Sequence, residues 1–405
     1  MTSLPTTPAP TNVEAQPAGL ESAAGGNPRF PCIEGLRAVA AVAVLVHHVA
    51  GTTGAVTSTA WGYVFAHLDA GVSVFFVLSG FLLYRPFAAA HVDKRPGPGL
   101  KRYTSRRFLR IFPAYWLALT AVFFVLNTVE YGDGKSLAMY YGLVHIYSKA
   151  HVLGGIIPVW SLATELSFYV FLPVLALAIG SVSRRVRRPL LAETVGVGLL
   201  WATGITVHSV LLASHDAATP ATLWLPSQVD LFALGMLLAV GHVASQRGHR
   251  VAVFEAMGRW PAWTWALACI PFWYAATQLN LPREFGDIPK GGEIGRQLCY
   301  GFTALLLVAP AVFGDQSKGW PRRLLRLRPV AFVGLVSYGV FLWHFDLLHY
   351  LEKHGALDWV PQARFFSVLA MDLGLAVVVA TVSWYLVEAP LVGRRRRVAP
   401  TPPVP

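Results

Sequence analysis

The chain has 405 residues, of which 55% are hydrophobic and only 13% are charged, and its formal net charge is +12. A soluble domain carries about 25% charged residues, so this composition excludes an ordinary soluble fold and indicates a membrane protein. The basic residues flank apolar segments and form no continuous face, which argues against a nucleic-acid partner.

Ten apolar segments are long enough, at about 17–25 residues, to cross a bilayer as helices. They cover residues 32–52, 70–88, 109–128, 159–180, 191–213, 227–245, 262–279, 296–313, 330–350 and 365–388. The sequence therefore predicts an all-α polytopic membrane protein, with about ten transmembrane helices around a polar central cavity or tunnel.

The distribution of basic residues predicts how these spans are oriented. With ten spans and a cytoplasmic N-terminus, the segments that face the cytoplasm hold 25 of the 33 Lys and Arg residues. The segments that face outside hold seven, and Arg37 lies within the first span. By the positive-inside rule, we expect a multi-pass protein of the cell's inner (plasma) membrane with both termini in the cytoplasm.

Three regions follow along the chain. Residues 1–28 are rich in Pro, Ala, Thr and Gly and are expected to be a disordered cytoplasmic tail. Residues 29–390 form the transmembrane domain, and residues 391–405 form a basic cytoplasmic tail. The three cysteines have no metal-like spacing, so packing is their expected role and no metal site is predicted.

The first span, "EGLRAVAAVAVLVHH" at 34–48, carries charged and titratable residues at both ends. Arg37 and His48 are separated by about three full helical turns, so they share one face, about 16 Å apart along the axis. Glu34 lies on the same side and could pair with Arg37. We interpret this face as lining a polar interior; the alternative is that Arg37 and His48 extend to the two headgroup layers.

The segment before the third span, "KRYTSRRFLRIFP" at 101–113, concentrates basic residues at the predicted cytoplasmic surface. Arg107 and Arg110 share one helical face, and guanidinium groups suit a polyphosphate. The alternative is that these residues only set the topology and attract anionic lipid.

Later spans carry further polar residues at matching depths. Glu165, in "WSLATELSFY", lies in the outer third of the fourth span, and His344 lies in the outer half of the ninth. Glu388 lies at the cytoplasmic boundary of the tenth span. Because ionisable groups at membrane depth are costly, they usually face a cavity or a partner. Each residue also has a structural interpretation. In that case Glu165 only holds helices together, His344 is a hydrogen-bonded core histidine, and Glu388 is a charge at the end of a helix.

These residues resemble acyltransferase family 3, the integral-membrane O-acyltransferases of bacteria, from about residue 31 to residue 390. The matching stretches are Gly35-Leu36-Arg37 with His48, "GVSVFFVLSGFLL" (71–83), "RRFLRIFPAYW" (106–116), "WSLATELSFY" (160–169), "SYGVFLWH" (337–344) and "VEAP" (387–390). Two positions depart from the pattern. Phe341 replaces the usual tyrosine, so this position cannot be catalytic through a hydroxyl, and Gln228 stands where an arginine is expected.

The resemblance implies an acyl-CoA donor, with acetyl-CoA favoured, no tightly bound cofactor, and a hydroxyl acceptor on an envelope polysaccharide, a glycolipid such as a trehalose mycolate, or a macrolide sugar. We expect the coenzyme A phosphates to meet the inner arginines while the acyl group approaches His48, the predicted general base. Direct transfer and an acyl-histidine intermediate both remain open. Catalytic roles are predicted for His48, Glu165 and Arg37, with Glu165 either orienting His48 or stabilising its imidazolium. Substrate-binding roles are predicted for Arg107, Arg110, Ser337, Tyr338, His344, Glu34, Trp160 and Ser161.

Two other functional classes fit parts of the pattern. Ten spans with buried Arg, Glu and His residues could form a proton-coupled transporter of a lipid or sugar, but we detect no inverted repeat. A non-catalytic assembly protein leaves the polar residues unexplained. Some family members continue into an extracytoplasmic esterase-like domain; this sequence ends 15 residues after Pro390, so transfer is expected to finish within the membrane domain.

Overall fold

A computed structural model describes residues 30–214, 220–283 and 290–391. The predicted tail at 1–28, and all but the first residue of the predicted tail at 391–405, lie outside the described residues. Every regular element in the described residues is a helix. In chain order they are α1 (Ile33–Thr52), α2 (Ala55–Ser58), α3 (Gly62–Ala66), α4 (Ala70–Val92), α5 (Leu100–Ala121), η1 (Val122–Leu126), α6 (Gly134–Tyr141), η2 (His145–Tyr147), η3 (Ile157–Val159), α7 (Trp160–Ser183), α8 (Pro189–Ser214), η4 (Pro220–Leu223), α9 (Leu225–Gln246), α10 (Ala252–Arg259), α11 (Pro261–Gln278), α12 (Lys290–Val312), α13 (Trp320–Leu325), α14 (Arg328–Leu335), α15 (Ser337–Lys353), η5 (Ala356–Asp358), η6 (Pro361–Ala363), α16 (Arg364–Ser383) and η7 (Trp384–Glu388).

The all-α polytopic architecture predicted from the apolar segments is confirmed. In the described part of the chain, eight helices are long and apolar enough to cross a membrane, or nine if α14 and α15 together form one span. The difference from ten arises at the predicted span 262–279. This segment is α11, whose Trp, Tyr, Thr and Gln side chains make it less apolar than the other spans.

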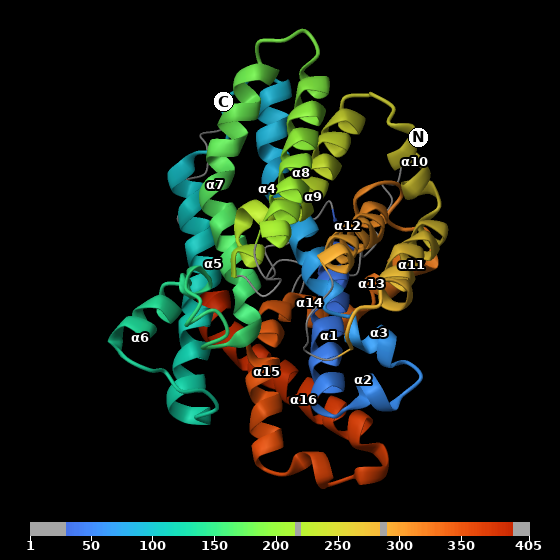
Figure 1. Cartoon of the computed structure of the whole chain (residues 1–405). Coiled ribbons are helices and arrows are strands. Elements are labelled where there is room, and N and C mark those ends of the chain that lie inside the picture. Colours follow the sequence, from blue (N-terminus) through green and yellow to red (C-terminus); the bar gives the residue numbers. More distant parts are fainter. Residues whose placement is uncertain (1–29, 215–219, 284–289, 392–405) are drawn as a thin grey trace, which may run out of the picture.

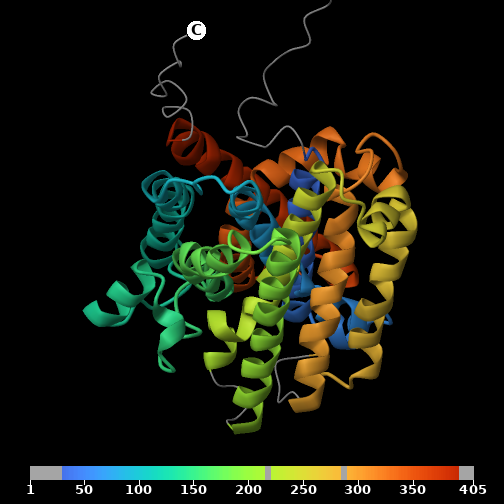
Figure 2. The same ribbon diagram turned by 90° about the horizontal axis from the view of Figure 1, so that it is seen from above.

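The helices form two groups that meet at the centre of the molecule (Figure 1). α4, α7, α8 and α9 stand together in one half, and α1, α15 and α16 gather in the other. α11 and α12 run side by side at one edge, where Figure 2 shows them in yellow and orange. α1 and α4 pack against each other and join the two groups.

Small residues allow the central helices α4 and α9 to approach closely. A β-carbon on Gly80 would overlap the carbonyl oxygen of Phe232, and one on Gly235 would overlap that of Val77. Close backbone packing at small residues is the usual basis of helix association in membranes, where lipid supplies no hydrophobic driving force between helices. These two glycines therefore hold α4, which contributes to the candidate site, against α9.

The ninth predicted span, 330–350, is not a single straight helix as the sequence suggested. α14 and α15 meet at Val336 with a bend of 74°. Gly334 lies directly against the backbone of Glu34 on α1, where a β-carbon would overlap the Glu34 carbonyl. This contact fixes α14 across the start of α1, so α15 begins at Ser337, inside the molecule.

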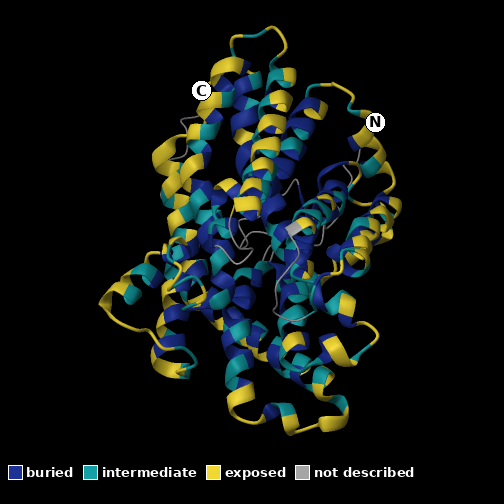
Figure 3. Ribbon diagram, viewed as in Figure 1, coloured by how far each residue is buried: buried dark blue, intermediate teal, exposed yellow. Residues whose placement is uncertain are grey.

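The outward faces of the long helices are apolar. Figure 3 shows exposed residues along the outer sides of the bundle. Exposed large hydrophobic residues recur at helical spacing on α7 (Val170, Val174, Leu177), α8 (Leu191, Val195, Leu199) and α16 (Leu375, Val378, Val382). Such surfaces belong against lipid, because contiguous apolar patches of this extent are rare on soluble proteins.

Replacing Gly235 with valine is expected to destabilise the α4–α9 contact, because the new side chain collides with backbone and overpacking costs about 1–3 kcal/mol. Thermal unfolding of the detergent-purified protein should show a lower midpoint for Gly235→Val. The matched control is Gly374→Val on α16, where a β-carbon meets nothing within 4 Å. Equal midpoints for the two variants would contradict the proposed packing.

Candidate active site

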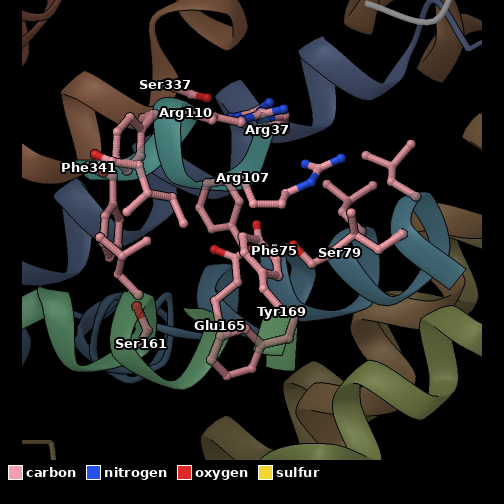
Figure 4. A pocket seen from close by; sticks show the side chains of 17 residues that line it. Arg37, Phe75, Ser79, Arg107, Arg110, Ser161, Glu165, Tyr169, Ser337 and Phe341 are labelled. Carbon is pink, nitrogen blue, oxygen red and sulfur yellow. Dashed lines mark hydrogen bonds between the residues drawn. The ribbon is translucent and has the colours of Figure 1, made fainter. Parts of the chain in front are cut away.

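A cavity between α1, α4, α5, α7 and α15 contains most of the predicted site residues (Figure 4). It encloses about 790 Å³ of space not occupied by atoms, including the part open to solvent. Seven predicted residues line it: Arg37, Arg107, Arg110, Ser161, Glu165, Ser337 and Tyr338. Apolar side chains that include Phe75, Leu82, Leu83 and Phe341 form the rest of the wall. The cavity thus combines guanidinium groups, a carboxylate and hydroxyls within an apolar lining.

Three arginines from two helices reach this cavity. Arg37 pairs with Glu34, as the spacing predicted, with 3.9 Å between its Nη1 and the carboxylate Oε2. Arg107 places its guanidinium 5.7 Å from the centre of the Tyr169 ring, and its buried Nε has no hydrogen-bond partner in the protein. Arg110 is exposed, at the opening of the cavity. The cavity therefore offers hydrogen-bond donors that a bound anion can use.

Glu165 is held by hydroxyl groups that were not predicted as site residues. Ser79 Oγ donates a hydrogen bond to its carboxylate, and Tyr169 OH donates another, 2.6 Å from Oε1. The prediction that Glu165 orients His48 is not met, because the carboxylate binds these two hydroxyls and His48 pairs with a different residue. Ser79 could have been found from sequence as the one hydroxyl in the apolar run "FFVLSGFLL".

His48 pairs with His344, and the geometry determines where the protons lie. His344 Nδ1 lies 3.1 Å from the Val340 carbonyl oxygen and 2.9 Å from that of Phe341. Carbonyl oxygens only accept, so Nδ1 of His344 carries the hydrogen and its Nε2 is the acceptor when the ring is neutral. His48 Nδ1, 3.1 Å from that Nε2, must therefore donate to it. The lone pair of neutral His48 is thus left on Nε2.

The histidine pair lies just beyond the cavity and does not line it. Ser337, Tyr338 and Phe341 face the cavity from α15, and fully buried His344 follows one turn later. The Phe341 ring centre is 5.9 Å from that of His344 and 6.0 Å from that of Phe75. The polar residues predicted at matching depths therefore lie in two places. Arg37 and Glu165 line the cavity, and His48 and His344 lie next to its end.

The hydroxyls of Ser161 and Tyr338 bind backbone carbonyls, whereas that of Ser337 does not. Ser161 Oγ donates to the Pro158 carbonyl at 3.0 Å, and Tyr338 OH donates to that of Ile111 at 2.9 Å. Ser337 is fully buried, and its hydroxyl has no partner in the protein. Trp160 packs against Phe76 and, like Glu34, is not among the lining residues.

The departure at Gln228 lies away from the cavity. Its side-chain amide donates to the Thr222 carbonyl at 2.8 Å, and its Oε1 accepts from Gln297 at 3.3 Å. Gln228 joins α9 to η4 and α12, and the cavity walls do not depend on it.

Comparisons with known proteins show which family and which proteins the chain is similar to. The model of a family described as "Acyltransferase domain" matches residues 30–388. Similar proteins are peptidoglycan O-acetyltransferase OatA of Listeria monocytogenes (24% identical, covering 89% of this chain and 55% of the relative) and putative peptidoglycan O-acetyltransferase YrhL of Bacillus subtilis (25%, 89% and 55%). Another is nodulation protein 10 of Rhizobium leguminosarum bv. viciae (25%, 81% and 85%). The chain spans about half the length of the first two relatives, and no solved structure matches it.

The tautomers of the histidine pair can be measured. Nitrogen-15 NMR of histidine-labelled protein in lipid should show His48 and His344 protonated at Nδ1 when neutral, whereas a histidine in water favours Nε2. Spectra of His48→Asn and His344→Asn variants assign the signals. An Nε2-protonated His48 would contradict the hydrogen-bond pattern.

Proposed function

The chain belongs to the acyltransferase family that its residues 30–388 match, and on that premise we propose that it is a membrane O-acyltransferase. It moves an acetyl or short acyl group from acyl-CoA, on the cytoplasmic side, to a hydroxyl of an envelope sugar or glycolipid. One observation carries the proposal: a cavity with three arginines ends one helical turn from a histidine pair that leaves a basic nitrogen available.

The arginines bind the coenzyme A part of the donor. Coenzyme A carries several phosphates and cannot cross a bilayer, so it enters from the side where the basic residues concentrate. Arg110 at the opening and Arg107 behind it form charge-assisted hydrogen bonds with phosphate oxygens. The pantetheine arm then follows the cavity past Arg37 and brings the thioester towards the end at Phe341.

His48 acts as the general base. Its Nε2 accepts the proton of the acceptor hydroxyl while the hydroxyl oxygen attacks the thioester carbonyl carbon. A carbon–oxygen bond forms, the carbon–sulfur bond breaks, and the leaving thiolate takes the proton back from the imidazolium. His344 supports the reactive tautomer of His48 by accepting from its Nδ1. Direct transfer of this kind requires no covalent enzyme intermediate.

The start of α15 supplies positive potential to the cavity, which Ser337 lines. Its first backbone N–H groups have no intrahelical partner, as at any helix N-terminus, and the helix dipole favours negative charge there. Ser337, the first residue of α15, also has an unpartnered hydroxyl. These groups stabilise the oxyanion that develops on the thioester carbonyl.

The acceptor approaches from the outer side, where the histidine pair lies. Relatives named as peptidoglycan O-acetyltransferases suggest an envelope polysaccharide as the acceptor class. The donor is thus bound on the cytoplasmic side of the plasma membrane and the acceptor on its outer side. In this proposal the chain crosses the membrane several times and has both termini in the cytoplasm.

Removal of the base tests the mechanism. His48→Ala should lower acetyl transfer by at least about 100-fold, the usual contribution of a general base, while its abundance in membranes stays normal. The assay supplies radiolabelled acetyl-CoA to membranes of cells that express the chain and measures free thiol and label in the envelope fraction. The control is His354→Ala, an exposed histidine at the end of α15 whose ring contacts the Tyr350 carbonyl. Wild-type turnover by well-folded His48→Ala protein would refute the assignment of His48 as the base. Equal thiol release by membranes with and without the chain would favour a transporter.

Donor binding tests the arginines. Arg107→Ala should weaken coenzyme A binding by about tenfold or more, because a hydrogen bond to a charged group contributes about 1.5–3 kcal/mol. Calorimetry on the purified protein in lipid nanodiscs measures the affinity. Arg102→Ala, an exposed arginine of α5 outside the cavity, removes the same charge and should change the affinity by less than twofold. Equal losses in the two variants would indicate a general charge effect.

A further inference from the structure

Two aromatic rings lie against each other in the wall of the cavity. Phe75 of α4 and Phe341 of α15 line it, and their ring centres lie 6.0 Å apart at an interplanar angle of 67°. Phe341 is 7% exposed, and its position is fixed from behind by His344, whose ring centre is 5.9 Å away. The Phe341 ring therefore lies between the cavity and His344.

The order of residues along α15 and α4 shows where on each helix the two rings lie. On α15, Ser337, Phe341 and His344 follow one another, with about 1.5 Å of rise per residue. On α4, Phe75 lies near the start of the helix, and Leu82 and Leu83 line the cavity two turns further along. Figure 4 shows Phe341 and Ser161 on one side of the cavity and Arg107 and Arg37 towards the other.

We propose that Phe341 sets the length of the acyl group: its ring, against Phe75, ends the cavity and leaves room only for a short chain beyond the thioester carbonyl. This inference rests on the proposed function. With the coenzyme A phosphates held by the arginines, the thioester end occupies the closed end of the cavity. Each further methylene of a longer acyl chain must then displace a buried aromatic ring.

A closed apolar pocket discriminates sharply by size. One methylene too many or too few changes selectivity by about 10–200-fold in such pockets, and a buried ring cannot yield without cost because protein interiors are closely packed. The phenylalanine also leaves this end of the cavity without the hydroxyl that a tyrosine would supply. Length discrimination at this position is therefore steric.

Binding of coenzyme A thioesters without an acceptor isolates this effect from turnover. Calorimetry on the full-length protein in nanodiscs compares free coenzyme A with acetyl-, butyryl- and hexanoyl-CoA. Wild-type protein should bind acetyl-CoA at least as well as coenzyme A, and butyryl- and hexanoyl-CoA at least tenfold more weakly than acetyl-CoA. In Phe341→Ala this penalty should fall to within about threefold, because the space freed by the ring accepts the longer chain.

Two further variants distinguish the effect of the Phe341 ring on acyl-chain length from the effect of a larger cavity volume. Phe341→Tyr keeps the ring and should retain the wild-type length profile. Leu83→Ala enlarges the same cavity away from Phe341 and should leave the butyryl-to-acetyl ratio within twofold of wild type, whatever its overall affinity. An unchanged ratio in Phe341→Ala, or an equal change in Leu83→Ala, would overturn the inference. Failure of coenzyme A itself to bind wild-type protein would instead count against the proposed function.

Discussion

The cost of placing charge at membrane depth is the constraint on which this structure depends. A charged group in hydrocarbon must find protein partners or face a polar cavity, and a charge buried within the protein is under the same constraint. Arg322, outside the predicted spans and 2% exposed, donates to four backbone carbonyls, those of Pro310, Lys318, Gly258 and Phe313. Its donors are therefore used in joining α10, α12 and α13. Arg107, by contrast, retains an unpartnered donor beside a cavity, and the proposed function assigns this donor to a bound phosphate.

The cavity exists because five helices are held in one arrangement by close backbone contacts. Gly80 and Gly235 bring α4 against α9, and Gly334 brings α14 against the start of α1. The second contact has the larger consequence, since it accompanies the 74° bend that starts α15 at Ser337. α15 then runs from the cavity to the histidine pair, so a single helix connects the proposed donor site to the proposed base.

Because Glu165 and His48 have different partners, their proposed roles differ from those expected from the sequence. Glu165 is bound by Ser79 and Tyr169 within the cavity, so it shapes the polar surface along which a donor would lie. His48 is paired with His344, a neutral partner that sets its tautomer without adding a negative charge. Such a base remains neutral until it receives a proton, which suits a step in which the proton is taken from a hydroxyl and returned to a thiolate.

The sequence by itself determined the membrane class, most of the spans and the Glu34–Arg37 pair, because apolar length and helical periodicity are local properties. Together with the family resemblance, it also identified seven of the residues that line the cavity. It did not determine the bend at Val336, the partners of Glu165 or the contact between Phe75 and Phe341. Each of these depends on residues far apart in the chain: Gly334 against Glu34, Ser79 against Glu165 and Phe75 against Phe341. A helical pattern assigns a residue to a face and a depth, but which helix that face meets, and at what angle, is decided by backbone packing in the folded bundle.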